Sequence, residues 1–274
     1  MPDLKDALAV ALGNDFRGEI RHGEDLGRQS YLGIGGPADH YVAPADALSL
    51  KRCLLLAGER KMPVFVLGGG TNVLIPDEGF RGMVISLKHF TMKKMINEQK
   101  DSAEIFVEAG VALPGLIGFC GEHGYSGLEG LAGIPGTVGG AIAGNSGAYG
   151  QEIKDVARTI VVMFRNGTIR KLETGEFSLG YRRSFVPENP VILSANMLFR
   201  RDNPETVKEA IRTTIMKKKA AQPVWERSLG CVFKNPQGEA AWQLIESAGC
   251  RGLRVGDIEV SDLHANFFIN RGQG

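Results

Sequence analysis

The sequence predicts an α+β protein made of three successive units. Three observations support this prediction: the length of 274 residues, short apolar runs typical of strands, and helical apolar stripes between those runs. A chain of this length has room for two or three small domains with cores of their own. We expect the units to span residues 1–90, 91–201 and 202–274.

The first unit is expected to hold a glycine loop, one helix and two strands. The loop lies at residues 33–37, and the apolar runs at 64–67 and 84–87 predict short buried strands. Asp46 is a residue type that caps helix N-termini, because its carboxylate accepts hydrogen bonds from unpaired amides. The helix that follows carries an apolar stripe on one face, formed by Leu50, Cys53, Leu54 and Ala57.

The second unit is expected to combine strands with one amphipathic helix. Strands are predicted at residues 105–107 and 191–199. Gly121 and Gly124 are expected to end the helix, since glycine is unfavourable inside helices and common just after them. The apolar stripe of this helix is formed by Leu113, Leu116, Ile117 and Cys120.

A β-hairpin is also predicted within the second unit. Two apolar runs, residues 160–164 and 168–172, flank the dipeptide Asn166-Gly167. Because Asn-Gly suits the left-handed conformations of a type I′ turn, we expect a tight hairpin with that turn.

The third unit begins with a predicted amphipathic helix, whose apolar stripe includes Val207, Ile211 and Ile215. This helix ends in the lysine run 217–219, which predicts a solvated basic face. A second helix is expected at residues 238–247 and a strand at 267–270.

The charge and cysteine patterns argue against several classes of protein. With 32 basic and 31 acidic residues, the net charge of +1 gives no reason to expect nucleic-acid or membrane partners. No apolar run reaches the ~18 residues of a membrane span, and the N-terminal stretch is too short and too charged for a signal peptide. We expect a cytoplasmic protein with no metal site and no disulfide, because its cysteines form no C-x-x-C pair: Cys53, Cys120, Cys231 and Cys250.

Glycine is over-represented, and its first cluster predicts a phosphate cradle. There are 37 glycines, about twice the ordinary usage of ~7%, and eight of them fall within residues 130–150. In Leu67–Ile75 (LGGGTNVLI) a strand runs into three glycines, whose successive amides can hold phosphate oxygens. The segment lacks the lysine of a P-loop and the spacing of GxGxxG, so a plain tight turn is the alternative.

The second cluster, residues 133–150 (GIPGTVGGAIAGNSGAYG), offers many backbone donors without side-chain obstruction. A large planar cofactor can lie flat along such a segment. The alternative is a glycine-rich packing loop. We regard it as the weaker interpretation, because so much uncovered backbone costs conformational entropy and burial.

Two further motifs carry charged or reactive side chains. In Gly180–Ser184 (GYRRS) a guanidinium can hold a carboxylate in a bidentate manner, although a surface arginine pair is the alternative. In Gly230–Pro236 (GCVFKNP), Cys231 is either a proton donor or a small buried apolar residue. Lys234 and Asn235 either contact a phosphate or carbonyl, or form a turn before the proline.

The last motif is His264-Ala265-Asn266, which precedes an apolar strand. A lone histidine is more often structural than catalytic, so ligand contact and a structural role both stand as interpretations of His264.

Taken together, these motifs resemble the UDP-N-acetylenolpyruvoylglucosamine reductases. The resemblance runs from about Ser30 to the end of the chain, in an ordered series of segments: SYLGIGGPA, VLGGGTNVLI, GLEGLAGIPGTVGGAIAGNSGAYG, GYRRSFVP, GCVFKNP and SDLHANFFIN. The order and the spacing argue against a chance match. The sequence lacks a long tyrosine-bearing insertion, and in this it resembles the shorter subtype of the family.

The resemblance implies an FAD-binding fold of the vanillyl-alcohol-oxidase (PCMH) type. Two α+β subdomains would hold FAD between them, and a smaller α+β domain would cover the substrate, in agreement with the three units above. The implied FAD contacts are Gly68, Gly69, Gly70, Thr71, Asn72, Gly133, Ile134, Pro135, Gly136, Val138, Gly139, Gly140, Ala141, Asn145, Gly147 and Ala148. The implied substrate contacts are Tyr181, Arg182, Lys234, Asn235, Arg254, His264 and Asn266.

The family's reaction implies NADPH and UDP-N-acetylglucosamine enolpyruvate as partners of a monomeric enzyme of peptidoglycan synthesis. NADPH would reduce FAD, which would then pass a hydride to the methylene carbon of the enolpyruvyl ether, giving UDP-N-acetylmuramate. Arg182 stands at the family position that stabilises charge on the substrate carboxylate. Cys231 stands where the family usually has a proton-donating serine. A thiol of reference pKa ~8.5 is a competent donor while it is protonated.

One catalytic residue of the family has no counterpart in this sequence. The family carries a glutamate beyond the HANFFIN segment, and this sequence stops before that region. We interpret the sequence as C-terminally truncated, because nothing upstream is degenerate. The alternatives are an impaired or non-catalytic binder of flavin or UDP-sugar, and another flavin oxidase or dehydrogenase of the same fold. The GYRRS and GCVFKNP motifs argue against the latter.

Overall fold

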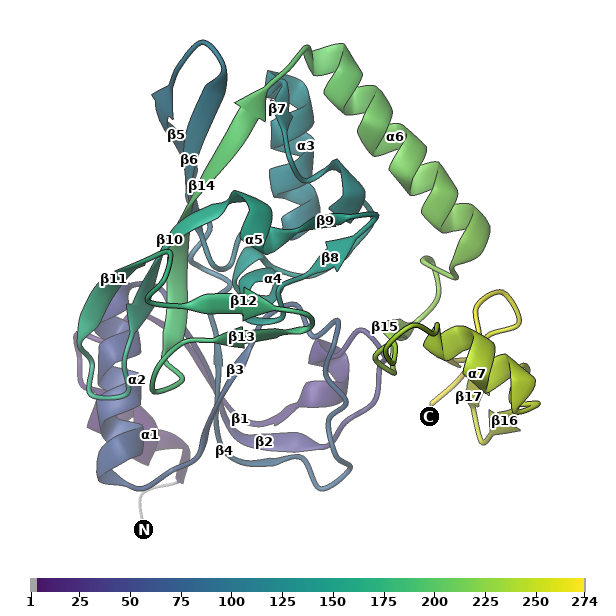
Figure 1. The fold of residues 1–274 in the computed structure, drawn as a ribbon. Coiled ribbons are helices and arrows are strands. Elements are labelled where there is room, and N and C mark those ends of the chain that lie inside the picture. Colours follow the sequence, from purple (N-terminus) through teal and green to yellow (C-terminus); the bar gives the residue numbers. More distant parts are fainter. Residues whose placement is uncertain (1–3, 274) are drawn as a thin grey trace.

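The computed structural model of the chain describes residues 4–273 (Figure 1). Its first sheet has four strands in the order β1-β2-β4-β3, with β1 and β2 antiparallel and with β4 parallel to both of its neighbours. Two helices and a 3-10 turn accompany it. The bounds are α1 (Leu4–Leu12), β1 (Gly18–Asp25), η1 (Leu26–Gln29), β2 (Pro37–Pro44), α2 (Ala47–Glu59), β3 (Val64–Leu67) and β4 (Phe80–Ser86).

The second sheet is antiparallel and has the order β11-β10-β14-β6-β5, with the short β7 paired to the end of β14. Its strands are β5 (Lys93–Glu98), β6 (Ser102–Glu108), β7 (Tyr125–Ser126), β10 (Ala157–Met163), β11 (Ile169–Glu173) and β14 (Val191–Arg201). The helices are α3 (Leu113–His123), η2 (Glu129–Leu131), α4 (Val138–Ala143) and α5 (Ile153–Val156). Two small ribbons complete the unit: β8 (Gly147–Ala148) with β9 (Gln151–Glu152), and β12 (Ser178–Gly180) with β13 (Arg183–Phe185).

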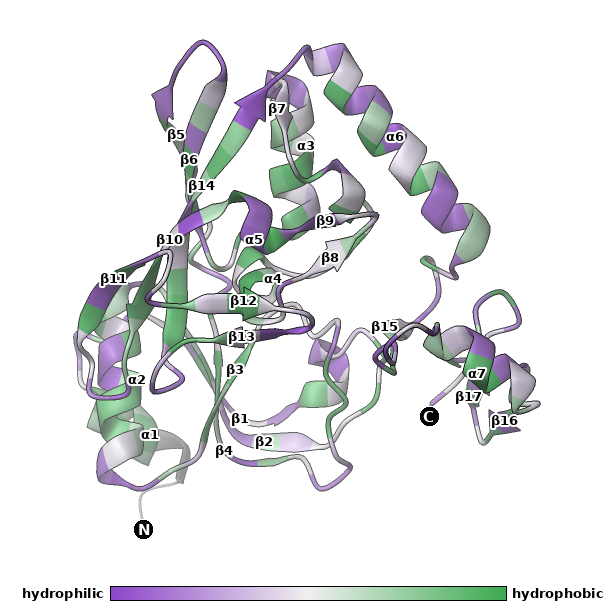
Figure 2. Cartoon of the chain, in the orientation of Figure 1, coloured by the Kyte–Doolittle hydropathy of each residue, from purple (hydrophilic) through white to green (hydrophobic). Residues whose placement is uncertain are grey.

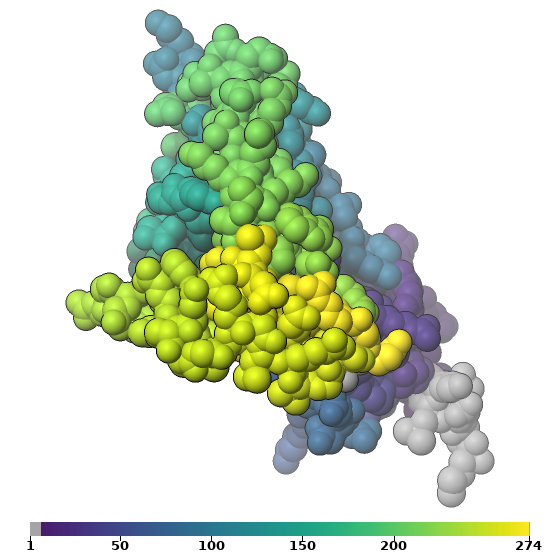
Figure 3. Space-filling view, turned by 90° about the vertical axis from the view of Figure 1, so that its right-hand side faces the viewer, coloured from purple at the N-terminus to yellow at the C-terminus, as the bar shows by residue number. Residues whose placement is uncertain are grey.

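A long helix, α6 (Pro204–Ala221), packs on α3 and η2 and leads to the last sheet. That sheet has the order β15-β18-β17-β16, and its elements are β15 (Ser228–Cys231), α7 (Ala241–Ser247), β16 (Arg254–Val255), β17 (Ile258–Val260) and β18 (Phe267–Asn270). In Figure 3, α6 runs down one face of the molecule and the last sheet lies across its lower end. The predicted division at residues 90 and 201 stays a prediction, with α6 at the start of the third unit and packed on the second.

Three clusters of buried apolar side chains form the core, and they fall within the first two units. Figure 2 shows the hydrophobic residues of these units in green along their strands and helices. One of the clusters joins the two large sheets, because Val42 and Met83 of the first sheet and Met163 and Val191 of the second belong to the same cluster. Among the described residues, none of 222–273 belongs to any of the three. The first two units therefore share an interior that the last sheet lies outside.

The predicted helix after Asp46 is confirmed. The Asp46 carboxylate accepts a hydrogen bond from the amide of Ser49 at 2.7 Å, and the predicted apolar stripe of α2 is buried. The strands predicted at 64–67, 84–87, 105–107, 191–199 and 267–270 are present, while the helix predicted from residue 238 begins at Ala241. Sequence reasoning missed β1, because half of its residues are charged and all of them are exposed or half-buried.

The predicted hairpin is present as β10 and β11, but its type I′ turn is wrong. Gly167 has φ +78° whereas Asn166 has no positive φ, and a type I′ turn needs both. Phe164 and Thr168 pair instead, which leaves a loop of three residues. Its last residue, Gly167, is left-handed and donates to the carbonyl of Phe164 at 2.9 Å, as in hairpins that end a type I turn with glycine.

Two predictions about α3 and α6 are corrected. Gly121 does not end α3, which continues to His123 and stops at Gly124 with φ +72°. A side chain at Gly121 would meet Ile211 at 2.9 Å, so this glycine lets α6 approach α3. Lys218 is not part of a solvated basic face, because α6 buries it to 3% exposure against η2 and the loop that follows. Among the described residues, no helix has the length and apolarity needed to cross a bilayer.

Candidate active site

The two glycine clusters lie against each other between the first two units. A Cβ added to Gly69 would come within 2.9 Å of the Gly136 Cα, and one added to Gly136 would come within 2.8 Å of the Thr71 hydroxyl. A Cβ at Gly68 would likewise meet the Thr137 hydroxyl at 2.8 Å. The structure therefore brings together the two segments that the sequence assigned to FAD, at a separation that only glycine allows.

The first glycine segment leaves a row of backbone donors available. Among the described residues, none accepts a hydrogen bond from the amides of Gly69, Gly70, Thr71 or Asn72. Successive unpaired amides of this kind hold phosphate oxygens well, because each amide presents a fixed partial positive charge. The diphosphate of FAD has the chemistry that such a row fits.

A cavity of about 460 Å³ continues from the glycine segments into the space between the two sheets. Its walls include the strand backbone of residues 64–67 and the turn at Ala109-Gly110, and Arg165 stands at its edge. Burial lowers the pKa of Arg165 from its ordinary value. Sequence reasoning missed these wall residues, because they are ordinary strand ends with no motif of their own. The volume falls in the range of ligand pockets, about 300–1,000 Å³.

Several residues assigned to FAD contribute backbone rather than side chains. Val138 and Ala141 are buried in the largest core cluster, and Ile134 packs against it. Gly147 and Ala148 form β8, which pairs with β9 behind the glycine segment. The remaining glycines, with Pro135, line the exposed side of the same loop. These assignments stay predictions. If they hold, the backbone of these residues is the part that contacts FAD.

Arg182 lies at the tip of the β12–β13 ribbon. Gly180 pairs with Arg183, so Tyr181 and Arg182 form a two-residue loop. Arg182 has φ +55°, a left-handed conformation that costs a non-glycine residue about 1–2 kcal/mol. Non-glycine residues persist there only when the surroundings hold them, and such positions are common at functional sites.

The glycine-rich segment holds this ribbon in place. The hydroxyl of Ser184 donates to the carbonyl of Ala143 at 2.8 Å, and the side-chain amide of Asn145 donates to the carbonyl of Gly180 at 3.1 Å. The ribbon that carries Arg182 is therefore anchored to the same backbone that forms the second glycine segment.

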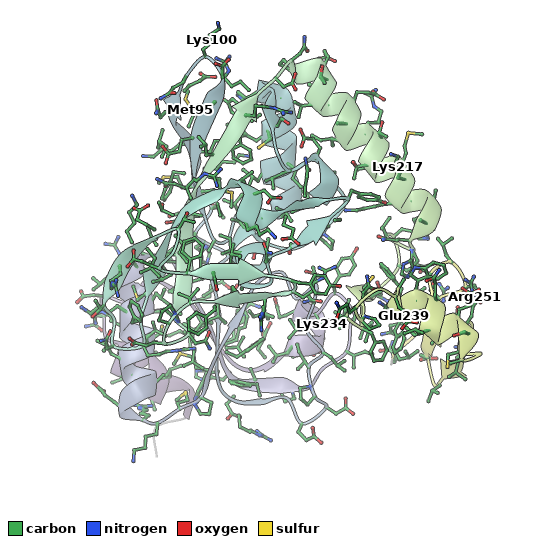
Figure 4. The ribbon with its side chains drawn as sticks, in the orientation of Figure 1. Met95, Lys100, Lys217, Lys234, Glu239 and Arg251 are labelled. Atoms are coloured by element: carbon green, nitrogen blue, oxygen red, sulfur yellow. The ribbon has the colours of Figure 1, made fainter. Side chains whose placement is uncertain are left out.

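The third unit meets the ribbon at the GCVFKNP motif. The amide of Asn235 donates to the hydroxyl of Tyr181 at 3.3 Å, while the Asn235 side chain accepts from Ala241 at the start of α7. Lys234, one residue away, is exposed on the side of the third unit that faces the ribbon (Figure 4). Tyr181, Lys234 and Asn235 are thus neighbours, as their joint assignment to the substrate requires.

Cys231 ends β15 and lies within electrostatic reach of Arg182. The residue is exposed as a whole, yet protein atoms surround its sulfur enough that burial raises the pKa of the thiol. The positive charge of Arg182 counteracts part of this rise. A guanidinium of the second unit and a thiol of the third unit thus lie close enough for the charge of one to affect the pKa of the other.

Asn266 contacts the segment that follows Cys231, and His264 packs next to it. The side chain of Asn266 is 2% exposed, and it donates to the carbonyl of Phe233 and accepts from its amide, both at 2.8 Å. His264 packs between Trp242 and Phe267, and burial lowers the pKa of its ring. Their assignment to the substrate stays a prediction, and the structure shows each of them in contacts internal to the third unit.

Arg254 is the one assigned residue that the structure places apart. It lies on β16, at the opposite edge of the last sheet from β15, and it contacts Gly256 and Asp257. Arg182, Lys234 and Cys231 form an arrangement that can hold an anion, stabilise developing negative charge and supply a proton beside a backbone cradle for a diphosphate.

Comparison with known proteins decides the family. The model of an FAD binding domain matches residues 38–173, and that of the C-terminal domain of UDP-N-acetylenolpyruvoylglucosamine reductase matches residues 222–274. A reductase of that name from Geobacter sulfurreducens is 40% identical over 270 residues, which cover 98% of this chain and 88% of the relative. This chain belongs to the UDP-N-acetylenolpyruvoylglucosamine reductase family. A relative from Syntrophotalea carbinolica is 38% identical over 97% of this chain and 87% of its own length.

Solved structures agree with the family. The reductase from Thermus caldophilus superposes with a TM-score of 0.80 at 33% identity, covering 94% of this chain and 90% of that one. The protein BBE-like #28 from Arabidopsis thaliana reaches a TM-score of 0.51 at 16% identity over 68% of this chain and 41% of its own, which shows the fold alone. The predicted family and the predicted α+β FAD-binding fold with its extra domain are both confirmed.

Proposed function

We propose that this chain is an FAD-dependent oxidoreductase that reduces UDP-N-acetylglucosamine enolpyruvate to UDP-N-acetylmuramate with NADPH, in the cytoplasmic synthesis of peptidoglycan precursors. The observation that carries the proposal is the placement of Arg182 and Cys231, which approach each other from two units beside the glycine cradle. The reductase name of the relatives supports the choice of substrate. We infer a monomer.

The residues present fit FAD, because the glycine segments are spaced for a ligand backbone and the amides of 69–72 are available to a diphosphate. When bound, FAD would accept a hydride from NADPH and pass it to the methylene carbon of the enolpyruvyl group. The chain's own part is to hold the substrate carboxylate, to stabilise charge and to supply a proton.

Arg182 would grip the carboxylate of the enolpyruvyl group. As hydride arrives at the methylene carbon, negative charge spreads from the neighbouring carbon onto that carboxylate. A guanidinium in a fixed position stabilises this charge more in the transition state than in the ground state, which is how such groups accelerate reactions. Arg182 keeps a strained left-handed backbone, which is consistent with a residue whose position is needed for function despite the conformational cost.

Cys231 would then donate its proton to the carbon that bears the carboxylate. The double bond thereby gains one hydride and one proton, and the thiolate regains a proton from solvent, to which the residue is exposed. Burial raises the pKa of this thiol, so it stays protonated at neutral pH. The pKa direction is therefore the one that a proton donor needs.

The test separates the two half-reactions by the visible absorbance of the purified protein under anaerobic conditions. NADPH should bleach the flavin, and UDP-N-acetylglucosamine enolpyruvate should then restore its colour. Bleaching without recovery would exclude the reductase function for this chain, and a protein that binds no FAD would exclude it as well.

Substitutions at the two central residues assign their roles. Arg182→Ala should slow recovery of the flavin by about 10²–10³-fold and leave bleaching unchanged. Cys231→Ala should slow recovery by about 10²-fold or more. Cys231→Ser should retain more activity and lose the alkaline decline that we expect in the wild type as the thiol deprotonates. Equal damage to both half-reactions by Cys231→Ala would contradict the proton-donor role.

A further inference from the structure

We propose that Asn145 is a positioning residue for Arg182, fixing the turn that carries the guanidinium to the glycine-rich segment. The inference rests on the proposed function for its catalytic meaning. It starts from the backbone of Arg182, which is left-handed in a two-residue loop and needs outside support to remain so.

Three hydrogen bonds hold the ribbon on either side of that loop. One joins Tyr181 to the third unit, and one joins Ser184 to the carbonyl of Ala143. The third joins the carbonyl of Gly180, two residues before Arg182, to Asn145. The bond from Asn145 is the one whose donor side chain is buried, at 2% exposure, so water does not compete with it.

Asn145 itself is held on three sides. Its side-chain nitrogen donates to the Gly180 carbonyl at 3.1 Å and to the carboxylate of Glu152 at 3.0 Å, and its oxygen accepts from the amide of Lys154 at 3.1 Å. Its φ is +41°, a conformation that asparagine tolerates better than most residues. Both of its donors are used, so the amide fixes the distance between two separate segments of the second unit.

Glu152 extends this arrangement toward Arg182. Its carboxylate caps the start of α5 and lies 2.5 Å from the ammonium of Lys154. The hydrogen bond from Lys154 lowers the pKa of Glu152, and Asn145 and the charge of Arg182 act in the same direction. Asn145 therefore links the ribbon backbone to a carboxylate whose pKa the charge of Arg182 also lowers.

The chemistry at position 145 requires an amide. Aspartate has the same shape, but it would present an oxygen to the Glu152 carboxylate and to the Gly180 carbonyl, where two donors are needed. Asn145→Asp is expected to release the ribbon from the glycine-rich segment and to displace the Arg182 guanidinium by a small distance. Small misplacements of this kind reduce catalysis strongly.

The control is Asn196→Asp. Asn196 on β14 donates to the carboxylate of Glu104 on β6 at 3.1 Å, so it makes the same type of bond in the same unit. Asn196 contributes nothing to the ribbon of Arg182. Asn145→Gly serves as a second variant, because glycine accepts the left-handed backbone and removes the side chain altogether.

The first readout is the pair of anaerobic half-reactions with FAD content measured in parallel. Asn145→Asp should slow recovery with the enolpyruvyl substrate by about 10- to 100-fold more than it slows bleaching by NADPH, when both rates are taken on FAD-loaded protein. Asn196→Asp should leave both steps unchanged. Equal slowing of both steps, or no slowing, in Asn145→Asp and Asn145→Gly would overturn the positioning role.

The second readout needs no turnover and separates this inference from the proposed function. Trypsin cleaves after Arg182 and Arg183, both of which are exposed. Release of the ribbon should raise the rate of cleavage there by about tenfold in both Asn145 variants and leave it unchanged in Asn196→Asp. If the wild type fails to reduce the enolpyruvyl substrate, the proposed function is wrong. Faster trypsin cleavage of the Asn145 variants would still support the role of Asn145 in holding the ribbon. Unchanged cleavage would overturn it.

Discussion

The FAD-binding region and the third unit are held together by different forces. The two large sheets share buried apolar clusters, and one cluster takes side chains from both. The last sheet shares in none of them among the described residues, and it contacts the rest through polar groups. Asn270 on β18 donates to the carbonyl of Leu32 at 2.9 Å, and Asn235 reaches Tyr181.

This difference indicates a division of labour. Apolar packing is dense and resists deformation, which suits a cradle that must present backbone amides at fixed spacing. A few hydrogen bonds, each contributing about 0.5–1.5 kcal/mol, can open and close more readily. We therefore expect changes in the cradle to affect the cofactor strongly and changes at the polar contacts to affect only the substrate step.

The largest effect is expected from Gly136→Ala in the cradle. Gly136 has φ +110°, and a Cβ would also meet the Thr71 hydroxyl at 2.8 Å. Backbone strain and overpacking together cost about 2–5 kcal/mol, so FAD affinity, measured by flavin fluorescence, should fall at least about 30-fold. Gly175→Ala is the control, since Gly175 has φ +108° with nothing within 4 Å. Equal loss of FAD in both variants would show that strain alone, not the packed cradle, is responsible.

An intermediate effect is expected at Lys218, in the last turn of α6 before the third unit. Burial lowers its pKa from 10.5 to about 8, so between about pH 8 and pH 10.5 the unfolded chain binds more protons than the folded chain. The free energy of unfolding should therefore rise with pH in this window, by about 3 kcal/mol relative to Lys218→Met. Urea unfolding at the two ends of the window measures the difference.

The control for Lys218 is its neighbour Lys217, which is exposed on α6 and is labelled in Figure 4. Lys217→Met should differ from the wild type by the same free energy at both pH values. A flat difference for Lys218→Met as well would show that the end of α6 opens to water and belongs with the loosely held third unit.

The smallest effect is expected from Tyr181→Phe, which removes a single bond between the ribbon and the third unit. Losing the 3.3 Å contact with Asn235 should cost about 0.5–1.5 kcal/mol, seen as a rise of up to about tenfold in KM for the enolpyruvyl substrate. Reduction of FAD by NADPH should not change. Tyr149→Phe is a matched control, because both tyrosines are 52% exposed. A loss of FAD from Tyr181→Phe would contradict the proposed independence of the two regions.

The sequence predicted the elements whose causes are local. The Asp46 cap, the strands that run into glycine loops and the end of α3 at Gly124 depend on neighbouring residues alone. Gly121 and Lys218 were misinterpreted because their roles are set by another element: α6 in the first case, and the η2 loop in the second. The pattern of a single sequence does not show which distant element will pack against a given residue.

The site shows the same limit. Motifs identified Arg182 and Cys231, but nothing in the sequence joins a position at 182 to one at 231, because that neighbourhood exists only once the third unit folds back. Asn145 was assigned to FAD by its place in the glycine segment, and its side chain is in fact engaged by Gly180, Glu152 and Lys154. The glycine motifs supply part of the cavity wall, but the strand residues that complete it, such as 64–66 and 191–192, carry no motif.

The raised pKa of Cys231 has a consequence for the durability of the protein. Peroxides attack the thiolate, not the thiol, so a sulfur that stays protonated is oxidised slowly. The burial that keeps Cys231 an acid thus also protects it from conversion to sulfenic acid, at a position where a serine would carry no such risk. Burial raises the pKa values of Cys53 and Cys120 to about 12, so these thiols should be oxidised even more slowly. The residue that we propose as proton donor is therefore exposed as a whole, while the thiol itself resists oxidation.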